Sequence, residues 1–328
     1  MDLRSEELLS ETGFADLLLD NKQNAIRIEG DLCDVPESIQ HLMPKLYESC
    51  KAEYAKCGTP DFRLSTDGGA GFRVVAINSS TGDLLFVLRK LSEYIYSWRE
   101  LRFSEKILQN ILNPERQTAR QGHLSQKKDN NEVARGGVIL IAGETDSGKS
   151  TTANAIIHEI ATRKPWFVMC FEDPIETFFT KKYTTNARIV QVETPSHDTG
   201  KGLKNALRAN VDVIRVGEIR DEETAELVAS AAISGHTVIA TIHASSQSNA
   251  VARYCSLLGQ NPQLVANSLR CCIHQALSKG SSFQTRNPTM SYLGNNNPRT
   301  KAFLVDMKIS QLNQEAINQT QNIMNGVT

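Results

Sequence analysis

The chain has 328 residues, of which 40% are hydrophobic and 22% charged, and its formal net charge is −1. This length allows two ordinary domains, each able to bury its own core. Residues 1–100 hold 11 Lys and Arg against 17 Asp and Glu, and the remaining residues hold 25 against 20. Neither part carries the strongly basic stripe typical of nucleic-acid binders, so no nucleic-acid partner is expected.

No segment has the pattern of a signal peptide or a membrane-spanning helix. The first residues, MDLRSEELLSE, are acidic and lack an apolar stretch. Residues 227–252 lack Lys, Arg, Asp and Glu, but their many Ser, Thr, His and Gly residues indicate a helix followed by a buried strand. The seven cysteines include no C-x-x-C pair, and their odd number excludes a complete disulfide framework. These features are typical of a reduced, cytoplasmic protein without a zinc knuckle.

Residues 1–98 are predicted to form a small α+β domain. FADLLLD (14–20) and NAIRIEGDL (24–32) are short apolar runs that indicate strands, and residues 38–54 carry apolar side chains at helical spacing. GFRVVAI (71–77) and LLFVLRKL (84–91) again have strand-like patterns, and the turn cluster NSSTGD joins them.

Residues 99–137 are predicted to link this domain to the next one. SEKILQNIL (104–112) has the apolar spacing of a helix. Residues 114–134 are polar, have no periodicity and contain almost no large apolar side chains. They therefore predict a mobile surface loop.

Residues 138–328 alternate between apolar strand patterns and helical patterns. The predicted strands are GVILIAG, WFVMCFED, RIVQVE, VDVIRVGEI and HTVIATIHA. Strands that alternate with helices predict an α/β fold whose mostly parallel sheet is covered on both faces. A C-terminal helical segment and a tail follow. Beyond Gly280 the sequence is rich in Asn, Ser and Thr, and AFLVDMKI (302–309) is the candidate for an edge strand.

Residues 143–151, GETDSGKST, match the phosphate-binding loop pattern G-x-x-x-x-G-K-[ST]. The glycines let backbone N–H groups converge on phosphate oxygens, Lys149 supplies positive charge at the β- and γ-phosphates, and Ser150 ligates Mg²⁺. A predicted strand precedes the loop and a predicted helix follows it, as this motif requires. We therefore expect a nucleoside triphosphate and Mg²⁺ to bind here. The expected binding residues are Gly143, Glu144, Thr145, Asp146, Ser147, Gly148, Lys149, Ser150 and Thr151.

Asp146 is unusual because it places a carboxylate where a polyphosphate should lie. Aspartate tolerates the left-handed backbone that glycine would otherwise supply, so the loop can still form. In an active enzyme we expect the side chain either to point into water or to be neutralised by a basic group. Arg220 or an arginine of the N-terminal domain is the expected partner.

An acidic cluster, FEDPIETFF, follows a predicted strand and contains Glu172, Asp173 and Glu176. Carboxylates at the carboxyl end of a strand lie where α/β sheets bind ligands. The alternative is the first turn of a helix, where Pro174 and nearby acids are favourable.

Two further patterns follow in the sequence. The apolar strand that ends at Glu218 resembles a Walker B segment, whose acid binds Mg²⁺ or orients the attacking water, although Arg215 within it has no explanation from the sequence. His236 and His243 flank another strand at a spacing of seven, which directs their side chains to opposite faces and argues against a shared metal ion. Each histidine is either a core residue or a γ-phosphate sensor.

In this order, the four clusters resemble the type II/IV secretion NTPase superfamily, especially the PilT-like pilus-retraction ATPases and the conjugation or type IV secretion ATPases. GETDSGKST is similar to the Walker A motif of these proteins, EDPIE to their Asp box, VGEIRDEET to their Walker B motif and SGHTVIATIHA to their His box. The resemblance extends over residues 13–308. It implies a PAS-like N-terminal domain over 1–98 and a RecA-like ATPase domain over 138–328.

The resemblance also implies a function. The chain would form a homohexameric, ATP- and Mg²⁺-dependent motor, held peripherally at the inner membrane by a platform protein of a pilus, conjugation or secretion machine. Glu218 would polarise water, Glu176 would assist at the metal or water, and Arg73 and Arg89 would reach the nucleotide from the N-terminal domain. The full set of implied catalytic residues is Glu218, Glu176, Lys149, Arg73, Arg89, His243 and His236, and the implied metal ligands are Ser150 and Glu172.

The sequence departs from the family pattern in several places. Asp146 and Glu144 replace a glycine and a proline that the family usually has, and Gly71 stands where it often has an arginine. The A-I-R-A-G-E stretch of retraction ATPases and the four-cysteine zinc element of many extension ATPases are absent. Two alternatives stay open: a ring subunit that binds nucleotide with little hydrolysis, and a RecA-like nucleic-acid motor. An aromatic content of 6% argues against the nucleic-acid motor, and the complete set of motif residues favours a working ATPase.

Overall fold

The computed structural model describes residues 16–20, 24–28, 31–65, 71–80, 82–91, 94–113, 133–179, 183, 186–194, 198–278 and 288–325. These residues divide into two compact units. The first contains the residues up to Tyr94 together with Pro174–Phe178, and the second contains the rest. Most of the predicted polar loop, residues 114–132, lies outside the described residues. After it, Val133 is buried and the Ala134 N–H donates to the Leu112 carbonyl at 2.8 Å.

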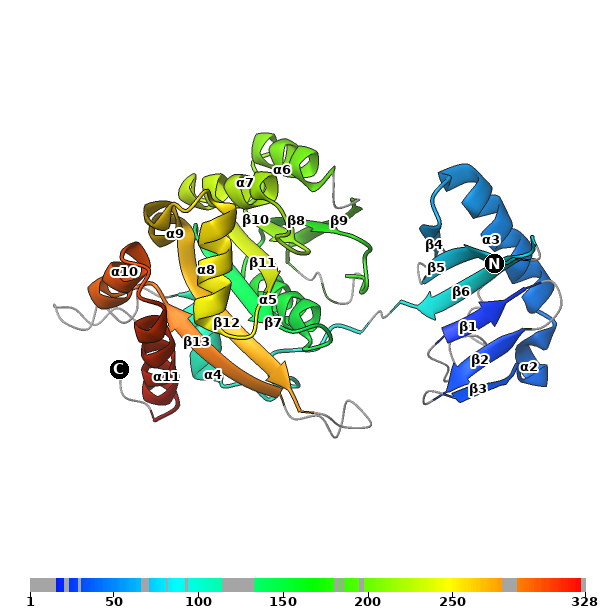
Figure 1. Ribbon diagram of the computed structural model, residues 1–328, viewed down its shortest axis with the longest axis horizontal. Helices are drawn as coiled ribbons and strands as arrows, with labels where there is room; N and C mark the ends of the chain where they lie inside the picture. The colour runs from blue at the N-terminus through cyan, green and yellow to red at the C-terminus, as the bar shows by residue number, and fades with distance from the viewer. Residues whose placement is uncertain are drawn as a thin grey trace. The chain divides into compact units, whose positions relative to one another are not determined.

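Within the described residues, the first unit is an antiparallel six-stranded sheet with the order β3-β2-β1-β6-β5-β4, accompanied by two helices (Figure 1). Its elements are β1 (Asp16–Leu19), β2 (Ala25–Ile28), β3 (Asp31–Asp34), α2 (Glu37–Gln40), α3 (Met43–Cys57), β4 (Asp61–Ser65), β5 (Gly71–Asn78) and β6 (Leu84–Lys90). Phe72, Val74 and Ala76 alternate along β5 and are buried, because every second side chain of a strand points to the same face. Leu46 and Cys50 of α3 pack into the same core.

The second unit contains a seven-stranded sheet with the order β13-β12-β7-β11-β10-β8-β9 (Figure 1). Its strands are β7 (Val138–Gly143), β8 (Phe167–Glu172), β9 (Arg188–Glu193), β10 (Val213–Val216), β11 (Thr237–His243), β12 (Leu269–Leu277) and β13 (Pro288–Gly294). Neighbouring strands are parallel except for β12 and β13, which are antiparallel. The prediction of an α/β fold with a mostly parallel sheet is therefore confirmed.

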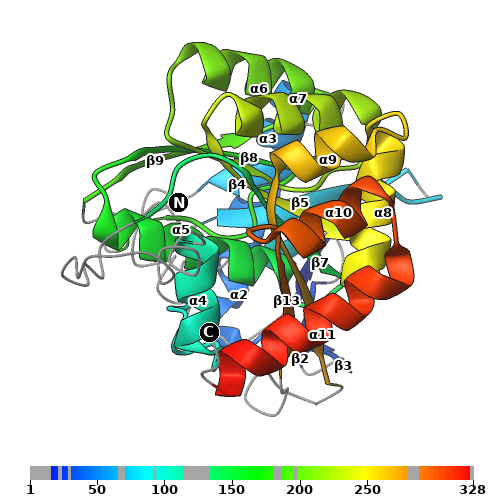
Figure 2. The same cartoon turned by 90° about the vertical axis from the view of Figure 1, so that its left-hand side faces the viewer.

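Helices cover both faces of this second sheet (Figure 2). On one face are α4 (Glu105–Leu112) and α5 (Lys149–Arg163), and on the other are α6 (Thr199–Arg208), α7 (Glu222–Ile233), α8 (Gln247–Leu257), α9 (Pro262–Ser268) and α10 (Pro298–Val305). Along β7, Val138 and Leu140 enter one core while Ile139 and Ile141 enter the other. A strand buried on both faces needs the continuous apolar run seen in this sequence. Within the described part of the chain, no helix is both long and apolar enough to cross a bilayer.

The expected edge strand at AFLVDMKI is wrong. This segment belongs to α10 and the turn that follows it, and α11 (Ile309–Asn325) begins at its last residue. The side chain of Asn297 accepts the Thr300 N–H at the start of α10, and Pro298 occupies the first turn, where its missing N–H costs nothing. The edge strands are β9, which was predicted, and β13, which the sequence pattern did not indicate.

Candidate functional site

The phosphate-loop sequence connects the end of β7 to the start of α5. Gly148 has a φ of 84° at the N-terminus of α5, and Asp146 has a φ of 60°, so both adopt the left-handed conformation. A Cβ on Gly143 would lie 2.4 Å from Ser147 Oγ and 2.6 Å from the carbonyl oxygen of Gln275. The loop therefore needs glycine at 143 because a side chain would not fit there, and it favours glycine at 148 because of the left-handed backbone. At 146 aspartate adopts the left-handed backbone instead of glycine.

Lys149 folds back over this loop. Its Nζ donates to the carbonyl oxygens of Gly143 at 3.0 Å and Glu144 at 2.6 Å, and the hydroxyl of Ser147 donates to Glu144 O at 2.8 Å. The first turn of α5 contains no acidic residue. An ammonium group beside the unpaired N–H groups of a helix N-terminus forms a site for an anion.

The Asp146 side chain is exposed, as expected if it points into water. Arg220, which was one expected partner for it, donates from Nε to Glu218 Oε2 at 2.7 Å. A solvent-exposed carboxylate is well screened, so it repels a bound phosphate less than a buried carboxylate would. The negative charge of Asp146 is therefore at the surface of the loop and is not buried in it.

Glu218 follows β10, two strands away from the loop. The Gly217 N–H donates to Phe171 O at 2.8 Å and the Ile219 N–H donates to Thr241 O at 2.9 Å, so neighbouring strands hold the turn on both sides. A Cβ on Gly217 would lie 3.2 Å from Phe171 O, which favours glycine beside β8. Because β7, β10 and β11 are parallel, Glu218 and the loop share the carboxyl edge of the sheet, where such folds bind ligands.

The two histidines lie at opposite ends of β11. His243, the last residue of the strand, is in register with Gly143, so it stands beside the start of the loop. His236 precedes the strand, and its Nδ1 lies 3.2 Å from Ala231 O. A strand of this length separates the two side chains by roughly 20 Å. The structure therefore brings His243, but not His236, to the loop of the same chain, and a sensor role for either stays a prediction.

Glu172, the last residue of β8, forms a buried ion pair with Arg215 of β10. The side chains of Glu172 and Arg215 are 4% and 1% exposed, and Gln191 of β9 donates to the other Glu172 oxygen at 3.1 Å. Burial is the main cause that raises the pKa of the neighbouring Cys170 thiol, and the negative charge of Glu172 raises this pKa further. The pair explains an arginine in a central strand, because a buried carboxylate needs a buried cation. Both oxygens of Glu172 have protein partners, and its role as a metal ligand stays a prediction.

Three further residues with implied roles belong to the first unit. Glu176 is exposed within Pro174–Phe178. Arg73 of β5 and Arg89 of β6 are directly paired across the sheet, so both side chains lie on the same face. Arg73 makes a two-point contact with Asp61, with Nη2 at 2.7 Å, and Arg89 Nε lies 2.9 Å from Asp16. The implied action of Glu176, Arg73 and Arg89 at a nucleotide stays a prediction.

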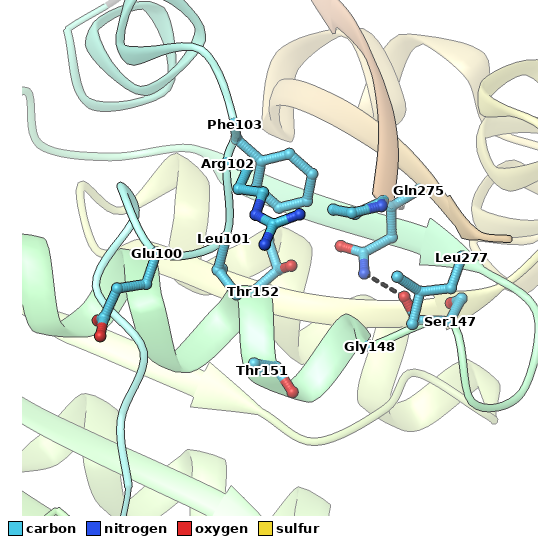
Figure 3. Close-up of a pocket in the computed structure, with 11 residues that line it drawn as sticks. Glu100, Leu101, Arg102, Phe103, Ser147, Gly148, Thr151, Thr152, Gln275 and Leu277 are labelled. Carbon is cyan, nitrogen blue, oxygen red and sulfur yellow. Dashed lines mark hydrogen bonds between the residues drawn. The ribbon is translucent and has the colours of Figure 1, made fainter. Parts of the chain in front are cut away.

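A cavity of about 120 Å³ adjoins the loop in the second unit (Figure 3). The chain segment before α4 supplies one wall, with Arg102 and Phe103, and the end of β12 supplies another, with Gln275. The lining residues are 100–103, Ser147, Gly148, Thr151, Thr152, Gln275, Leu277 and Pro288. Arg102 has a φ of 60°, a conformation that costs free energy in a residue with a Cβ and that often occurs at functional sites.

His274 stands on β12 in register with Ala142, just before the loop. Burial lowers the pKa of this histidine, and the nearby carboxylate of Glu144 partly opposes the shift. A pKa below the ordinary histidine value of about 6.5 favours the neutral imidazole. Lys149, and not this histidine, therefore supplies positive charge at the loop.

A family model described as Type II/IV secretion system protein matches residues 101–324, which include the loop, the Asp box, Glu218 and both histidines. The chain belongs to the type II/IV secretion system protein family. The family resemblance inferred from the four motifs is therefore confirmed.

Two relatives and one solved structure are similar over most of the chain. A twitching motility protein of Neisseria gonorrhoeae is 30% identical over 301 residues, which are 88% of this chain and 74% of the relative. The type IV pilus retraction ATPase PilT of Pseudomonas aeruginosa is 31% identical over 225 residues, 67% of this chain and 58% of the relative. A crystal structure of the pilus retraction motor PilT with bound ADP matches with a TM-score of 0.73 at 26% identity, covering 96% of this chain and 90% of that one.

Sequence reasoning missed the cavity beside the loop. Arg102, Phe103 and Gln275 are distant in sequence and belong to no local motif, so no periodicity or spacing could indicate them. For the Arg215–Glu172 pair, the sequence indicated that a partner exists but not which residue it is. The charge inside an apolar strand was a signal that a buried partner exists, but its identity depends on how β8 and β10 align.

Proposed function

We propose that this secretion-family protein is an ATPase that converts ATP hydrolysis into mechanical work for a type IV pilus, conjugation or secretion machine. Its main support is the shared sheet edge at which Lys149, Ser150 and Glu218 lie. Similarity to a retraction ATPase and to an ADP-bound retraction motor adds to it. In this proposal the second unit is a RecA-like ATPase domain and the first is a PAS-like domain.

The loop geometry supports phosphate binding. The backbone N–H groups of the loop and of the first turn of α5 would donate to phosphate oxygens. Lys149 would exchange the carbonyl oxygens of Gly143 and Glu144 for the β- and γ-phosphates, because a phosphate charge attracts the ammonium group more strongly than a carbonyl dipole does. Glu218, which is 26% exposed, would accept a hydrogen bond from the attacking water and orient it.

The residues at this edge fit a magnesium ion. Mg²⁺ prefers hard oxygen donors, and the hydroxyl of Ser150 and the carboxylate of Glu218 are of this kind. Ser150 would hold the ion, with Glu218 nearby, whereas the oxygens of Glu172 are engaged by Arg215 and Gln191. Bound there, the ion supplies neutralisation of the phosphate charge.

The proposal has a second element: the chain forms a homohexamer at the cytoplasmic side of the inner membrane. The assembly gives Arg73 and Arg89 a role at the nucleotide. Their planar guanidinium groups suit the charge that develops on a transferred phosphoryl group. In the proposed ring they would complete nucleotide sites, and a membrane platform protein would anchor the assembly.

Hydrolysis is therefore expected to depend on assembly. The specific magnesium-dependent ATPase activity per subunit should rise as protein concentration takes the chain from monomer to ring, as measured by phosphate release alongside light scattering. Arg73→Ala or Arg89→Ala should remove this rise while leaving the assembly intact. Constant activity per subunit across the transition would show that assembly is not required. ATP binding without activity in either state would support the alternative, a ring subunit with little hydrolysis.

Asp146→Gly is expected to tighten ATP binding more in the isolated subunit than in the assembled ring. A carboxylate about 6 Å from a phosphate charge repels it by roughly 3 kcal/mol at an effective dielectric near 20, and the exposure of Asp146 reduces this figure. In the ring, an arginine from the first unit would neutralise the charge.

Titration calorimetry on both states tests the Asp146 prediction. Asp146→Asn is the matched control, because asparagine keeps the left-handed preference and removes only the charge. Equal ATP affinity of the unaltered chain and both variants in both states would show that Asp146 only faces solvent.

A further inference from the structure

Among the described residues, only one of the two polar groups of the Gln275 side-chain amide has a hydrogen-bond partner. It lies near the end of β12 beside the phosphate loop and is 2% exposed. Its Nε2 donates to the carbonyl oxygen of Ser147. Its Oε1 is buried and has no hydrogen-bond partner among the described residues. A buried amide oxygen without a donor costs free energy, and a ligand that brings a donor recovers it.

The orientation of this amide is determined by its neighbour. The Ser147 carbonyl can only accept a hydrogen bond, so the NH₂ group must face it and Oε1 must face the other way. Figure 3 shows the result: the nitrogen is joined to Ser147, and the oxygen points to the side of the cavity where Arg102 lies. The cavity thus has one buried hydrogen-bond acceptor in a defined position.

The remaining walls suit a flat aromatic group. Arg102 and Phe103 bring a planar cation and an aromatic ring to one side, and Leu101 and Leu277 add apolar surface. Aromatic rings and guanidinium groups both stack on planar ligands. Thr151, in the first turn of α5, also lines the cavity, which therefore begins where bound phosphates would end.

We propose that this cavity receives the base of the nucleotide and that Gln275 Oε1 accepts a hydrogen bond from the 6-amino group of adenine. Gln275 is then a specificity-determining residue. Guanine carries an oxygen at this position, so two acceptors would face each other in a buried site, and GTP is rejected. This inference rests on the proposed nucleotide-binding function and adds to it the choice of base.

The test uses the full chain with Mg²⁺ and measures dissociation constants by titration calorimetry. The probes are ATP, GTP, 2′-deoxy-ATP and purine riboside triphosphate, which has hydrogen in place of the 6-amino group. Loss of one hydrogen bond should weaken binding of the purine riboside compound about tenfold relative to ATP. GTP should bind on the order of a hundredfold more weakly, and 2′-deoxy-ATP should bind like ATP.

Three results would overturn this assignment. Equal affinity for ATP and purine riboside triphosphate would show that Gln275 does not recognise the amino group. Weak binding of 2′-deoxy-ATP alone would assign the Gln275 oxygen to a ribose hydroxyl. Absence of binding by all four nucleotides would instead remove the proposed function on which the inference rests.

Gln275→Met provides a second measurement, because methionine keeps the length of the side chain and removes the acceptor. The affinity ratio of ATP to purine riboside triphosphate should fall from about ten to about one. A merely structural role, through the bond to Ser147, would weaken both nucleotides equally and leave the ratio unchanged. Gln263→Met, on the exposed surface of α9, is the matched control. If Gln275→Met does not fold, the nucleotide series on the unaltered chain still decides.

Discussion

Alanine in place of Lys149 is expected to weaken ATP binding by about a thousandfold, whereas glutamine in place of Glu218 leaves binding intact and stops turnover. An ammonium group about 4 Å from a phosphate charge contributes about 4 kcal/mol at an effective dielectric near 20, which corresponds to about a thousandfold in affinity. Glu218 instead acts on the attacking water, and loss of such a group lowers the rate by about 10²–10⁴-fold.

Calorimetry for binding and phosphate release for turnover separate these two effects. Lys201→Ala and Glu226→Gln are the matched controls, because they make the same chemical changes on exposed surfaces of α6 and α7. Normal hydrolysis by Glu218→Gln would remove this residue from its proposed role. Normal ATP affinity in Lys149→Ala would show that the loop does not bind the phosphates as proposed.

Breaking the buried Arg215–Glu172 pair is expected to give the largest loss of stability. Arg215→Leu leaves the Glu172 carboxylate without its cation in a site that is 4% exposed, and should lower the free energy of unfolding by about 3–5 kcal/mol. The double variant Arg215→Leu/Glu172→Leu removes both charges and should recover most of that loss. Lys201→Leu, at the exposed pair with Asp198, should change the free energy of unfolding far less, because solvent screens an exposed ion pair.

Tryptophan fluorescence during denaturation can measure the free energy of unfolding of each variant. The two tryptophans of the chain, Trp98 and Trp166, both lie in the second unit, so their signal follows the unit that holds the pair. Unchanged stability of Arg215→Leu would mean that the carboxylate does not depend on its arginine. A double variant less stable than either single variant would show that the pair itself is net stabilising.

The segments that sequence patterns predicted correctly are those in which local chemistry and tertiary position agree. The run VILIA indicated a buried strand, and β7 is buried on both faces. The segment AFLVDMKI misled because a short apolar run fits a strand as well as a helix. The cap at Asn297 and Pro298 was the local signal that could have decided it. Strands β12 and β13 were not predicted, and neither were β3 and β4, because DLCD and DFRLS show no clear apolar alternation.

The sequence by itself determined the phosphate loop, the strands β7 to β11 with the helices between them, and the family to which the chain belongs. These features depend on residues close together in the chain: the glycines at 143 and 148, Lys149, and the apolar periodicity on either side. Only the tertiary structure decided that Arg215 pairs with Glu172, that His243 but not His236 reaches the loop, and that Gln275 directs a buried side-chain oxygen into a cavity beside Arg102. Each of these contacts joins segments far apart in sequence, and the alignment of parallel strands, which no local pattern encodes, determines which side chains meet.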